Sequence, residues 1–198
     1  MPVAPNQAPL ILASASKYRR ELLARLSVDF SSVAPGTIET RQAGEAPDHL
    51  AMRLAREKAQ TIAAQHSKSV VIGADQVATR GDTVLGKPGD HEAAHRQLLE
   101  SSDQGVSFYT AVYLLDPLRG SSEHHLDHTR VHFRSLRDDE IQRYLELEKP
   151  YDCAGAFKAE GLGISLFWRI NTDDPTALQG LPLIWLASAL RRAGFVIP

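Results

Sequence analysis

Hydroxyl and cationic side chains follow an apolar run near the start of the chain, in the stretch LILASASKYRR at residues 10–20. Ser14 and Ser16 fall where an extended segment would turn into a helix, and backbone N–H groups at a helix start are unpaired and favour negative charge. Together with Arg19, these groups resemble a phosphate-binding turn. Plain N-capping by Ser16 is the alternative, but capping explains neither Ser14 nor a cation at position 19.

Two cations occupy positions that a helix would bury. At about 100° per residue, Arg19 falls inside the apolar arc of the helix expected over residues 17–27. Lys58 falls near the middle of the apolar face expected for residues 48–66. A buried cation without an anion is costly, so each should meet a protein carboxylate or a ligand. A structural ion pair for Arg19 and outward snorkelling of Lys58 are the alternatives.

A carboxylate and a further cation extend this set. The stretch VVIGADQV predicts an apolar strand that ends at Asp75, and a carboxylate at a strand end is a recurring site of metal binding or water activation in phosphoryl chemistry. A turn-forming Asp is the alternative. The sequence GKP places Lys87 on a rigid turn, which suits a point-charge contact with phosphate. The combined set predicts a binding site for a triphosphate and its metal.

Three other patterns are weaker indications of chemistry. HEAAH at residues 91–95 matches a zinc-protease motif, but His91 falls in the first turn of its helix, so a solvated helix start is the preferred interpretation. EHHLDH at residues 123–128 falls in a polar segment expected to be a loop or hairpin tip, which favours surface histidines over a metal site. Cys153 has no histidine at a recognisable spacing and is expected to be a small buried residue.

Alternating strand-like and helix-like segments must position these residues. Strands are expected at residues 10–13, 69–74, 106–115, 128–136 and 162–170. Helices are expected at residues 17–27, 48–66, 91–101, 138–148 and 183–193, with starts at Ser16, Pro47–Asp48, Asp90 and Asp138. This order predicts an α/β fold with a mixed β-sheet flanked by helices, in one domain over residues 1–198. Residues 1–9 are expected to be a flexible N-terminal segment.

Composition argues against several classes of partner. The formal net charge of −2 gives no overall attraction to nucleic acid or to anionic lipid. The single cysteine leaves no intramolecular disulfide and suits a reducing compartment, so we expect a cytoplasmic protein. No apolar run approaches the roughly 20 residues that span a bilayer, and the N-terminus lacks a signal-peptide pattern. We therefore expect no membrane association, and a mature chain that is the whole chain.

Several motifs together identify a family. LASASKYRRELL, RLAREKAQ, VIGADQV, GKP, CAGAFKAEGLGI and GLPL resemble, in order and spacing, the signatures of the Maf-like nucleoside triphosphate pyrophosphatases. The resemblance implies a two-lobed, inosine triphosphatase-like α/β fold with a central cleft. It also implies hydrolysis between the α and β phosphates of a nucleoside triphosphate with a divalent cation, Mg²⁺ or Mn²⁺. The family is often dimeric, which makes a homodimer an expectation here.

The resemblance also implies roles for individual residues. Asp75 matches the catalytic base or metal-linked carboxylate, and Glu39 matches a motif acid that helps to bind the metal. The matched substrate-binding positions are Ser14, Ser16, Arg19, Lys58 and Lys87. One departure from the pattern is Ile38, because an acid often precedes the residue that Glu39 matches.

Details of the motifs resemble the subfamily that acts on 7-methyl-GTP, in which the residues matching Tyr18, Gln76 and Glu160 are linked to base selection. A cationic 7-methylguanine ring would favour an aromatic face and a carboxylate. Tyr18 stands where the subfamily carries Trp, so weaker discrimination against GTP is expected. The alternatives are a dTTP and UTP pyrophosphatase of the same family, or a nucleotide-binding regulator of cell division without catalysis.

Overall fold

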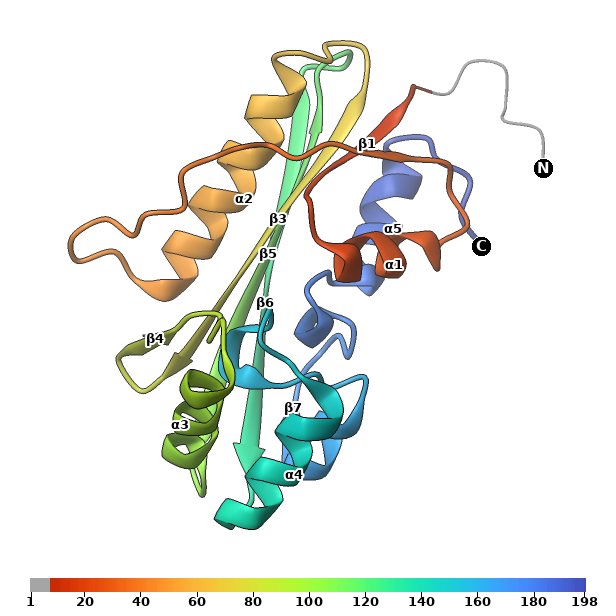
Figure 1. The fold of residues 1–198 in the computed structure, drawn as a ribbon. Helices are drawn as coiled ribbons and strands as arrows, with labels where there is room; N and C mark the ends of the chain where they lie inside the picture. The colour runs from red at the N-terminus through yellow and green to blue at the C-terminus, as the bar shows by residue number, and fades with distance from the viewer. Residues whose placement is uncertain (1–7) are drawn as a thin grey trace.

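The computed structural model describes residues 8–198, which form an open, seven-stranded mixed sheet with helices on both faces (Figure 1). The strands are β1 Leu10–Ala13, β2 Ser31–Ser32, β3 Val70–Arg80, β4 Thr83–Leu85, β5 Gly105–Asp116, β6 Ser121–Phe133 and β7 Phe167–Asn171. The helices are α1 Lys17–Ala24, α2 Pro47–Ala63, α3 His91–Ser101, α4 Asp138–Glu148 and α5 Leu183–Arg192. The predicted α/β fold with a mixed sheet is confirmed.

The sheet has the order β2-β1-β3-β5-β6-β7, with β4 paired to β3. β1 runs parallel to β2 and β3, whereas β3, β5, β6 and β7 pair antiparallel. The long strands β3, β5 and β6 extend through the whole height of the molecule (Figure 1). They join two lobes, which we define by their helices: the upper lobe contains α1, α2 and α5, and the lower lobe contains α3 and α4 (Figure 1).

Alternation along the strands assigns the helices to faces of the sheet. Leu12 and Ile72 pack in a cluster with residues of α1 and α5. Ile11 and Val71 point to the opposite face and pack in a cluster with residues of α2. Each upper face is therefore covered by apolar helix surface, which is the layered arrangement that buries both sides of a sheet.

Gly73 allows α2 to lie unusually close to β3. A Cβ atom at this position would collide with the backbone of Ala55 and Ala59 in α2. The close approach lets Lys58, the neighbour of Ala59 in the chain, reach β3 two residues beyond Gly73. The glycine is therefore required by the close packing of α2. It is not required by backbone conformation, since its φ angle lies outside the left-handed region.

One edge of β3 carries a gap in its pairing. β1 pairs with β3 only as far as Gly73, and β4 begins to pair with it at Ala78. Between them, residues 74–77 have no strand partner on that edge among residues 8–198. Side chains from both faces of β3 can meet at this gap, so it is a natural position for a site.

The structure corrects several expected elements. The strand predicted to end at Asp75 continues to Arg80, so Asp75 lies in the middle of β3. The strand continues because β5 pairs with β3 from Val71 to Thr79, beyond the end of the pairing with β1. The polar segment near residues 120–128 is not a loop: it starts at the tip of the β5–β6 hairpin, and β6 begins at Ser121 and pairs with β5. Pairing with a long neighbour outweighs the weak strand propensity of these polar residues.

Smaller differences occur at element ends. Leu162–Leu166 forms 3₁₀ turns and only Phe167–Asn171 is a strand, where 162–170 was expected. The N-cap of α4 is Arg137, so Asp138 is its first helical residue. β2 and β4 were not predicted, because two and three residues show no usable alternation.

The segment predicted to be flexible, residues 1–9, falls outside the described residues except for Ala8 and Pro9. In the part of the chain that the structure describes, no helix has the length and apolarity to cross a membrane.

Candidate functional site

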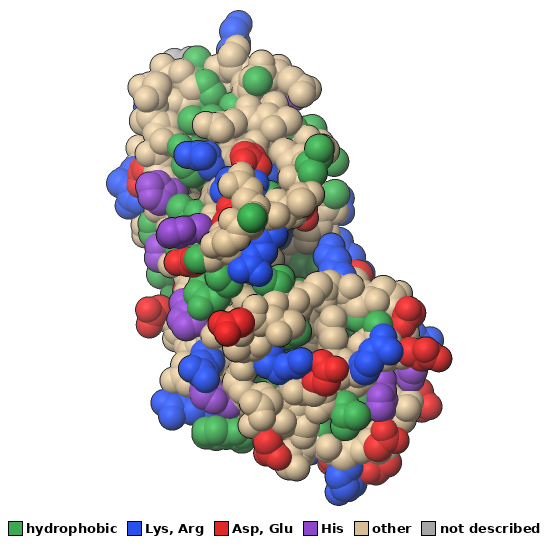
Figure 2. All heavy atoms as spheres, turned by 90° about the vertical axis from the view of Figure 1, so that its left-hand side faces the viewer, with side chains coloured by type: hydrophobic (Ala, Val, Ile, Leu, Met, Phe, Trp, Pro, Cys, Tyr) green, Lys and Arg blue, Asp and Glu red, His purple; other side chains and the backbone are tan. Residues whose placement is uncertain are grey.

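A cavity of about 630 Å³ lies at the gap in the β3 edge, between the upper and lower parts of the molecule. Figure 2 shows the surface hollowed at this height, with Lys and Arg side chains at the rim of the hollow. Nine of the ten predicted site residues line the cavity: Ser14, Ser16, Tyr18, Arg19, Glu39, Lys58, Gln76, Lys87 and Glu160. The tenth, Asp75, lies directly behind Lys58.

Lys58 joins two carboxylates at the cavity wall. Its Nζ lies 2.5 Å from Asp75 Oδ1 and 2.5 Å from Glu39 Oε1. The side chains of Lys58 and Asp75 are only 6% and 8% exposed, whereas that of Glu39 is 58% exposed. The snorkelling alternative for Lys58 is therefore wrong, because its ammonium group is buried in a double ion pair.

This arrangement shifts the two carboxyl groups in opposite directions. Burial raises the pKa of Asp75, and the nearby charges of Lys58 and Arg19 only partly oppose that effect. Burial also acts to raise the pKa of Glu39, but the hydrogen bond and charge of Lys58 outweigh it and leave this pKa lowered. Asp75 thus holds a proton more readily than an ordinary Asp, which suits a group that accepts one from water.

The turn between β1 and α1 is built around hydroxyl groups. Ser16 is the N-cap of α1 and accepts a hydrogen bond from the Arg19 backbone N–H at 3.3 Å. The Ser14 hydroxyl accepts one from the Ser16 backbone N–H at 3.1 Å. The capping alternative for Ser16 is therefore confirmed. Both hydroxyls and the start of α1 also line the cavity, so binding of an anion there stays a prediction.

Arg19 points inward, as predicted, but forms no structural ion pair with a described residue. Its Nε donates to the Gly180 carbonyl at 3.0 Å. Within residues 8–198, its two terminal nitrogens have no protein hydrogen-bond partner. Burial lowers the pKa of Arg19, whereas Asp75 and Glu39 raise it. The guanidinium therefore faces the cavity with donors available to an anion.

Gln76 is oriented by hydrogen bonds from its amide nitrogen. Nε2 donates to Thr110 Oγ1 at 2.9 Å, and to the carbonyls of Ala177 and Leu178 at 3.0 Å and 3.2 Å. These contacts leave the amide oxygen as the group available to a ligand. Gln76 can therefore accept a hydrogen bond from an N–H group in the cavity.

The chain from Cys153 to Phe157 shapes the lower wall of the cavity. Gly155 and Ala156 both have φ in the left-handed region, at 78° and 60°. A Cβ atom on Gly155 would lie 3.2 Å from the Phe157 ring and 3.3 Å from the Phe108 ring. The strained turn thus brings two aromatic rings, 5.4 Å apart and edge to face, into the wall.

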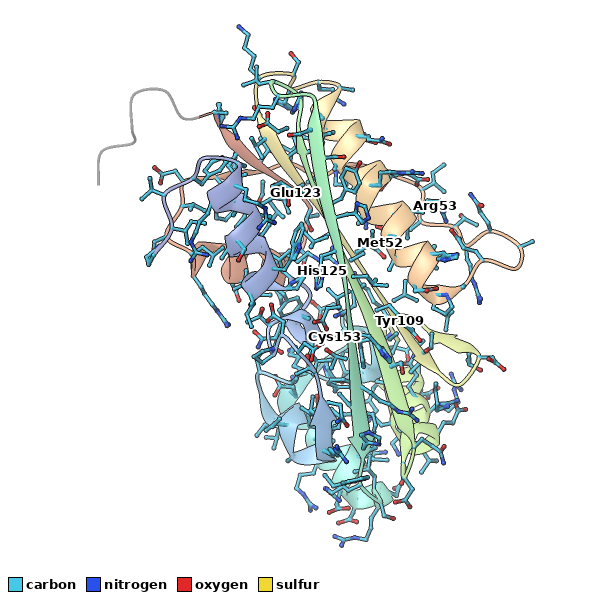
Figure 3. All side chains as sticks on the ribbon, turned by 180° about the vertical axis from the view of Figure 1, so that it is seen from behind. Met52, Arg53, Tyr109, Glu123, His125 and Cys153 are labelled. Carbon is cyan, nitrogen blue, oxygen red and sulfur yellow. The ribbon has the colours of Figure 1, made fainter. Side chains whose placement is uncertain are left out.

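Sequence reasoning missed the residue that anchors the loop carrying Glu39. Arg53 donates to both oxygens of Glu45, at 2.6 Å and 2.8 Å, and to the Thr40 carbonyl at 3.0 Å. Arg53 projects from α2, as labelled in Figure 3, and so fastens the loop to the helix that carries Lys58. It lowers the pKa of Glu45 to about 2. Arg53 is the first residue of the motif RLAREKAQ, in which the sequence alone indicated a role only for Lys58.

The remaining histidines do not converge on a common point. His91 is the first residue of α3, as predicted, but its half-buried ring contacts Tyr151 Oη and Gln142 Oε1 and so is not fully solvated. His95 contacts Asp138 instead. His124 and His128 lie on β6 and are stacked on Tyr113 and Tyr109 of β5, as ordered surface histidines. Figure 3 shows His125 between β6 and α5, where it stacks on Trp185.

The expectation for Cys153 was wrong. It is half-buried and lines the cavity, where its Sγ lies 3.5 Å from both Tyr18 Oη and Asp152 Oδ1. Burial raises its pKa to about 11. A thiol that stays protonated is a poor nucleophile, so Cys153 serves the shape and hydrogen bonding of the wall.

The carboxylates suit a hard divalent cation. Among the described residues, no three His, Cys, Asp or Glu side chains gather closely enough to hold a metal by themselves. Mg²⁺ is commonly held by one or two carboxylates together with substrate phosphates and water. Asp75 and Glu39, both in contact with Lys58, fit that kind of shared shell.

Comparison with known proteins supplies the family. A family model described as Maf-like protein matches residues 9–193. A "7-methyl-GTP pyrophosphatase" of Xanthomonas axonopodis pv. citri is 56% identical over 96% of this chain and 98% of its own. Proteins of the same name from Ralstonia nicotianae and Alcanivorax borkumensis are 50% and 47% identical, covering 94% and 98% of this chain and 96% and 98% of their own. This chain belongs to the Maf-like protein family.

Proposed function

We propose that this chain is a nucleoside triphosphate pyrophosphatase that converts 7-methyl-GTP to 7-methyl-GMP and pyrophosphate, and so removes a modified nucleotide. The observation that carries the proposal is the contact of Lys58 with both Asp75 and Glu39 at 2.5 Å, in a cavity that the free donors of Arg19 also face. The names of relatives that match almost the full chain support the same activity.

In the proposed reaction, a water molecule attacks the α-phosphorus and the bond between this phosphorus and the α–β bridging oxygen breaks. The bridging oxygen leaves with pyrophosphate. Asp75 accepts a proton from the attacking water, for which its raised pKa suits it. Arg19 and Lys87 bind the departing phosphates, where fixed cations stabilise the charge that develops.

A divalent cation, Mg²⁺ or Mn²⁺, would be held by Glu39 and Asp75 and would neutralise phosphate charge when bound. Lys58 keeps these two carboxylates close together before the metal arrives. Ser14, Ser16 and the first backbone N–H groups of α1 add neutral donors on the same side.

Selection of the base is assigned to three other residues of the cavity wall: Tyr18, Gln76 and Glu160. The Tyr18 ring offers a π face and Glu160 a carboxylate, and both attract a cationic 7-methylguanine more than neutral guanine. The Gln76 oxygen can accept a hydrogen bond from a guanine N–H. This division of labour supports 7-methyl-GTP over dTTP or UTP.

Initial rates of pyrophosphate release test the proposal, with 7-methyl-GTP, GTP, dTTP, UTP and CTP compared in Mg²⁺, Mn²⁺ and EDTA. We expect a metal-dependent preference for 7-methyl-GTP. Asp75→Asn should lower kcat by about 10²- to 10⁴-fold, the usual range for a lost general base. Asp82→Asn, an exposed site at the β3–β4 turn, is the matched control and should change little.

The outcomes separate the alternatives. Preferred turnover of dTTP and UTP would refute the base assignment while leaving the reaction intact. Tight nucleotide binding without any pyrophosphate release would refute catalysis and favour a regulatory role.

A further inference from the structure

The Tyr18 hydroxyl is held by a residue from the other lobe. It donates to the two carboxylate oxygens of Asp152, at 3.1 Å and 3.2 Å. Tyr18 lies in α1, and Asp152 lies 134 positions later in the chain, in the segment after α4. Both residues line the cavity, so this contact joins two distant segments of the chain in the cavity wall.

A carboxylate that accepts the phenolic proton also changes the ring. A hydrogen bond to an anion shifts electron density into the phenol, which strengthens the attraction of its face for a cation. Burial, the thiol of Cys153 and Asp152 all raise the pKa of Tyr18, so the phenol remains a donor. Burial would raise the pKa of Asp152, but the Tyr18 and Cys153 hydrogen bonds outweigh it and leave this pKa lowered.

Lys17 is the neighbour that opposes this effect. Its Nζ lies 3.5 Å from Asp152 and 4.9 Å from the centre of the Tyr18 ring. Both side chains of the ion pair are more than half exposed, so the pair itself adds little to stability. Lys17 supplies a positive charge beside the ring, which competes with any cationic base.

We propose that Asp152 is a positioning residue for base selection, which fixes the Tyr18 ring and makes its face more attractive to a positively charged purine. This inference rests on the proposed function for the nature of the substrate. It adds Asp152 to the residues that the family resemblance links to base selection. It also gives the hydroxyl group of Tyr18 a role, because only a residue with this hydroxyl can donate to Asp152.

Binding of the two nucleoside monophosphates tests the inference without requiring turnover. Isothermal titration calorimetry measures Kd for 7-methyl-GMP and for GMP, and their ratio reports selection of the cationic base. Asp152→Ala should lower this preference by about two- to fivefold, the size of a cation–π contact at a partly exposed site. Asp152→Asn keeps an acceptor but removes the charge, and should lie between Asp152→Ala and the unmodified protein.

Two further variants separate positioning from general electrostatics. Tyr18→Phe removes the hydroxyl but keeps the ring, and should reduce the preference as much as Asp152→Ala does. The double variant should reduce it no further, because the two groups act as one unit. Lys17→Ala should leave the preference equal or raise it. Asp139→Asn removes a comparable exposed carboxylate on α4 and is the charge control.

The results decide as follows. An unchanged Kd ratio in Asp152→Ala, an equal loss in Lys17→Ala, or simple addition of the Asp152 and Tyr18 effects would overturn the inference. Absence of pyrophosphate release would overturn only the proposed function, because the binding ratio is measured with the product nucleotides. Thermal melting checks that each variant folds, and Asp152→Asn serves if Asp152→Ala does not.

Discussion

Replacing Lys58 by Met should expose how much the buried ion pair contributes to stability. Met preserves most of the apolar stem, so the main loss is the ammonium group that contacts Asp75 at 2.5 Å. Asp75 is 8% exposed, so its carboxylate would be left buried and uncompensated. Breaking such a pair typically costs about 3–5 kcal/mol. At roughly 2–4 °C per kcal/mol for a chain of this size, the melting temperature should fall by about 6–20 °C.

The loss should depend on pH in a defined direction. Burial already raises the pKa of Asp75, and removal of Lys58 should raise it further. The folded protein then binds a proton that the unfolded chain releases, so the stability this proton provides is full at low pH and disappears as pH rises through the folded pKa. The deficit of Lys58→Met should therefore be larger at about pH 8 than at about pH 5.

Urea unfolding followed by circular dichroism at both pH values measures this deficit. The double variant Lys58→Met/Asp75→Asn should recover much of the lost stability while remaining inactive, because neither member of the buried pair then carries a charge. Lys68→Met, at an exposed position just before β3, is the control and should stay within about 0.5 kcal/mol of the unmodified protein. A loss below about 1 kcal/mol, an equal deficit at both pH values, or no recovery in the double variant would refute the reasoning.

Two other perturbations test the framework of the site. Gly73→Ala forces α2 away from β3 and should lower the free energy of unfolding by about 1–3 kcal/mol. Its kcat should also fall, because Lys58 on α2 moves. Gly86→Ala is the control and should be nearly neutral by urea unfolding, because a Cβ there meets nothing within 4 Å. Equal effects of the two alanines would contradict the packing argument. Arg53→Met releases Glu45 and the loop that carries Glu39, so hydrogen exchange in residues 37–46 should accelerate and the metal concentration for half-maximal activity should rise. Unchanged exchange in this loop would show that Arg53 does not anchor it.

The structure places nine of the ten predicted site residues in the wall of one cavity, although several of the elements that carry them differ from those expected. Helical spacing alone singled out Arg19 and Lys58, because a cation within an apolar arc requires an anion. The resemblance to Maf-like proteins then supplied Tyr18, Gln76 and Glu160, and all of these line one cavity. The prediction of family membership is confirmed.

Features that depend on contacts between distant segments could not be predicted. The apolar run before Asp75 ends there, yet the strand continues because β5 supplies hydrogen bonds along it. The first half of β6 has the polar composition of a loop, but it pairs with β5, and two of its histidines stack on Tyr109 and Tyr113 of that strand. The Asp152 contact with Tyr18 joins residues 134 positions apart, and no local pattern encodes such a distance.

The three long strands also determine how the molecule moves and unfolds. β3, β5 and β6 have 11, 12 and 13 residues and run unbroken from one lobe into the other. A strand of this length spans roughly 36–43 Å, and a hinge between the lobes would have to break several rungs of hydrogen bonds at once. We therefore expect access to the cavity to depend on side chains and on the loop before α2, with the sheet remaining rigid. We expect the same continuity to couple the two lobes into one cooperative unit, which a single transition in thermal melting would show.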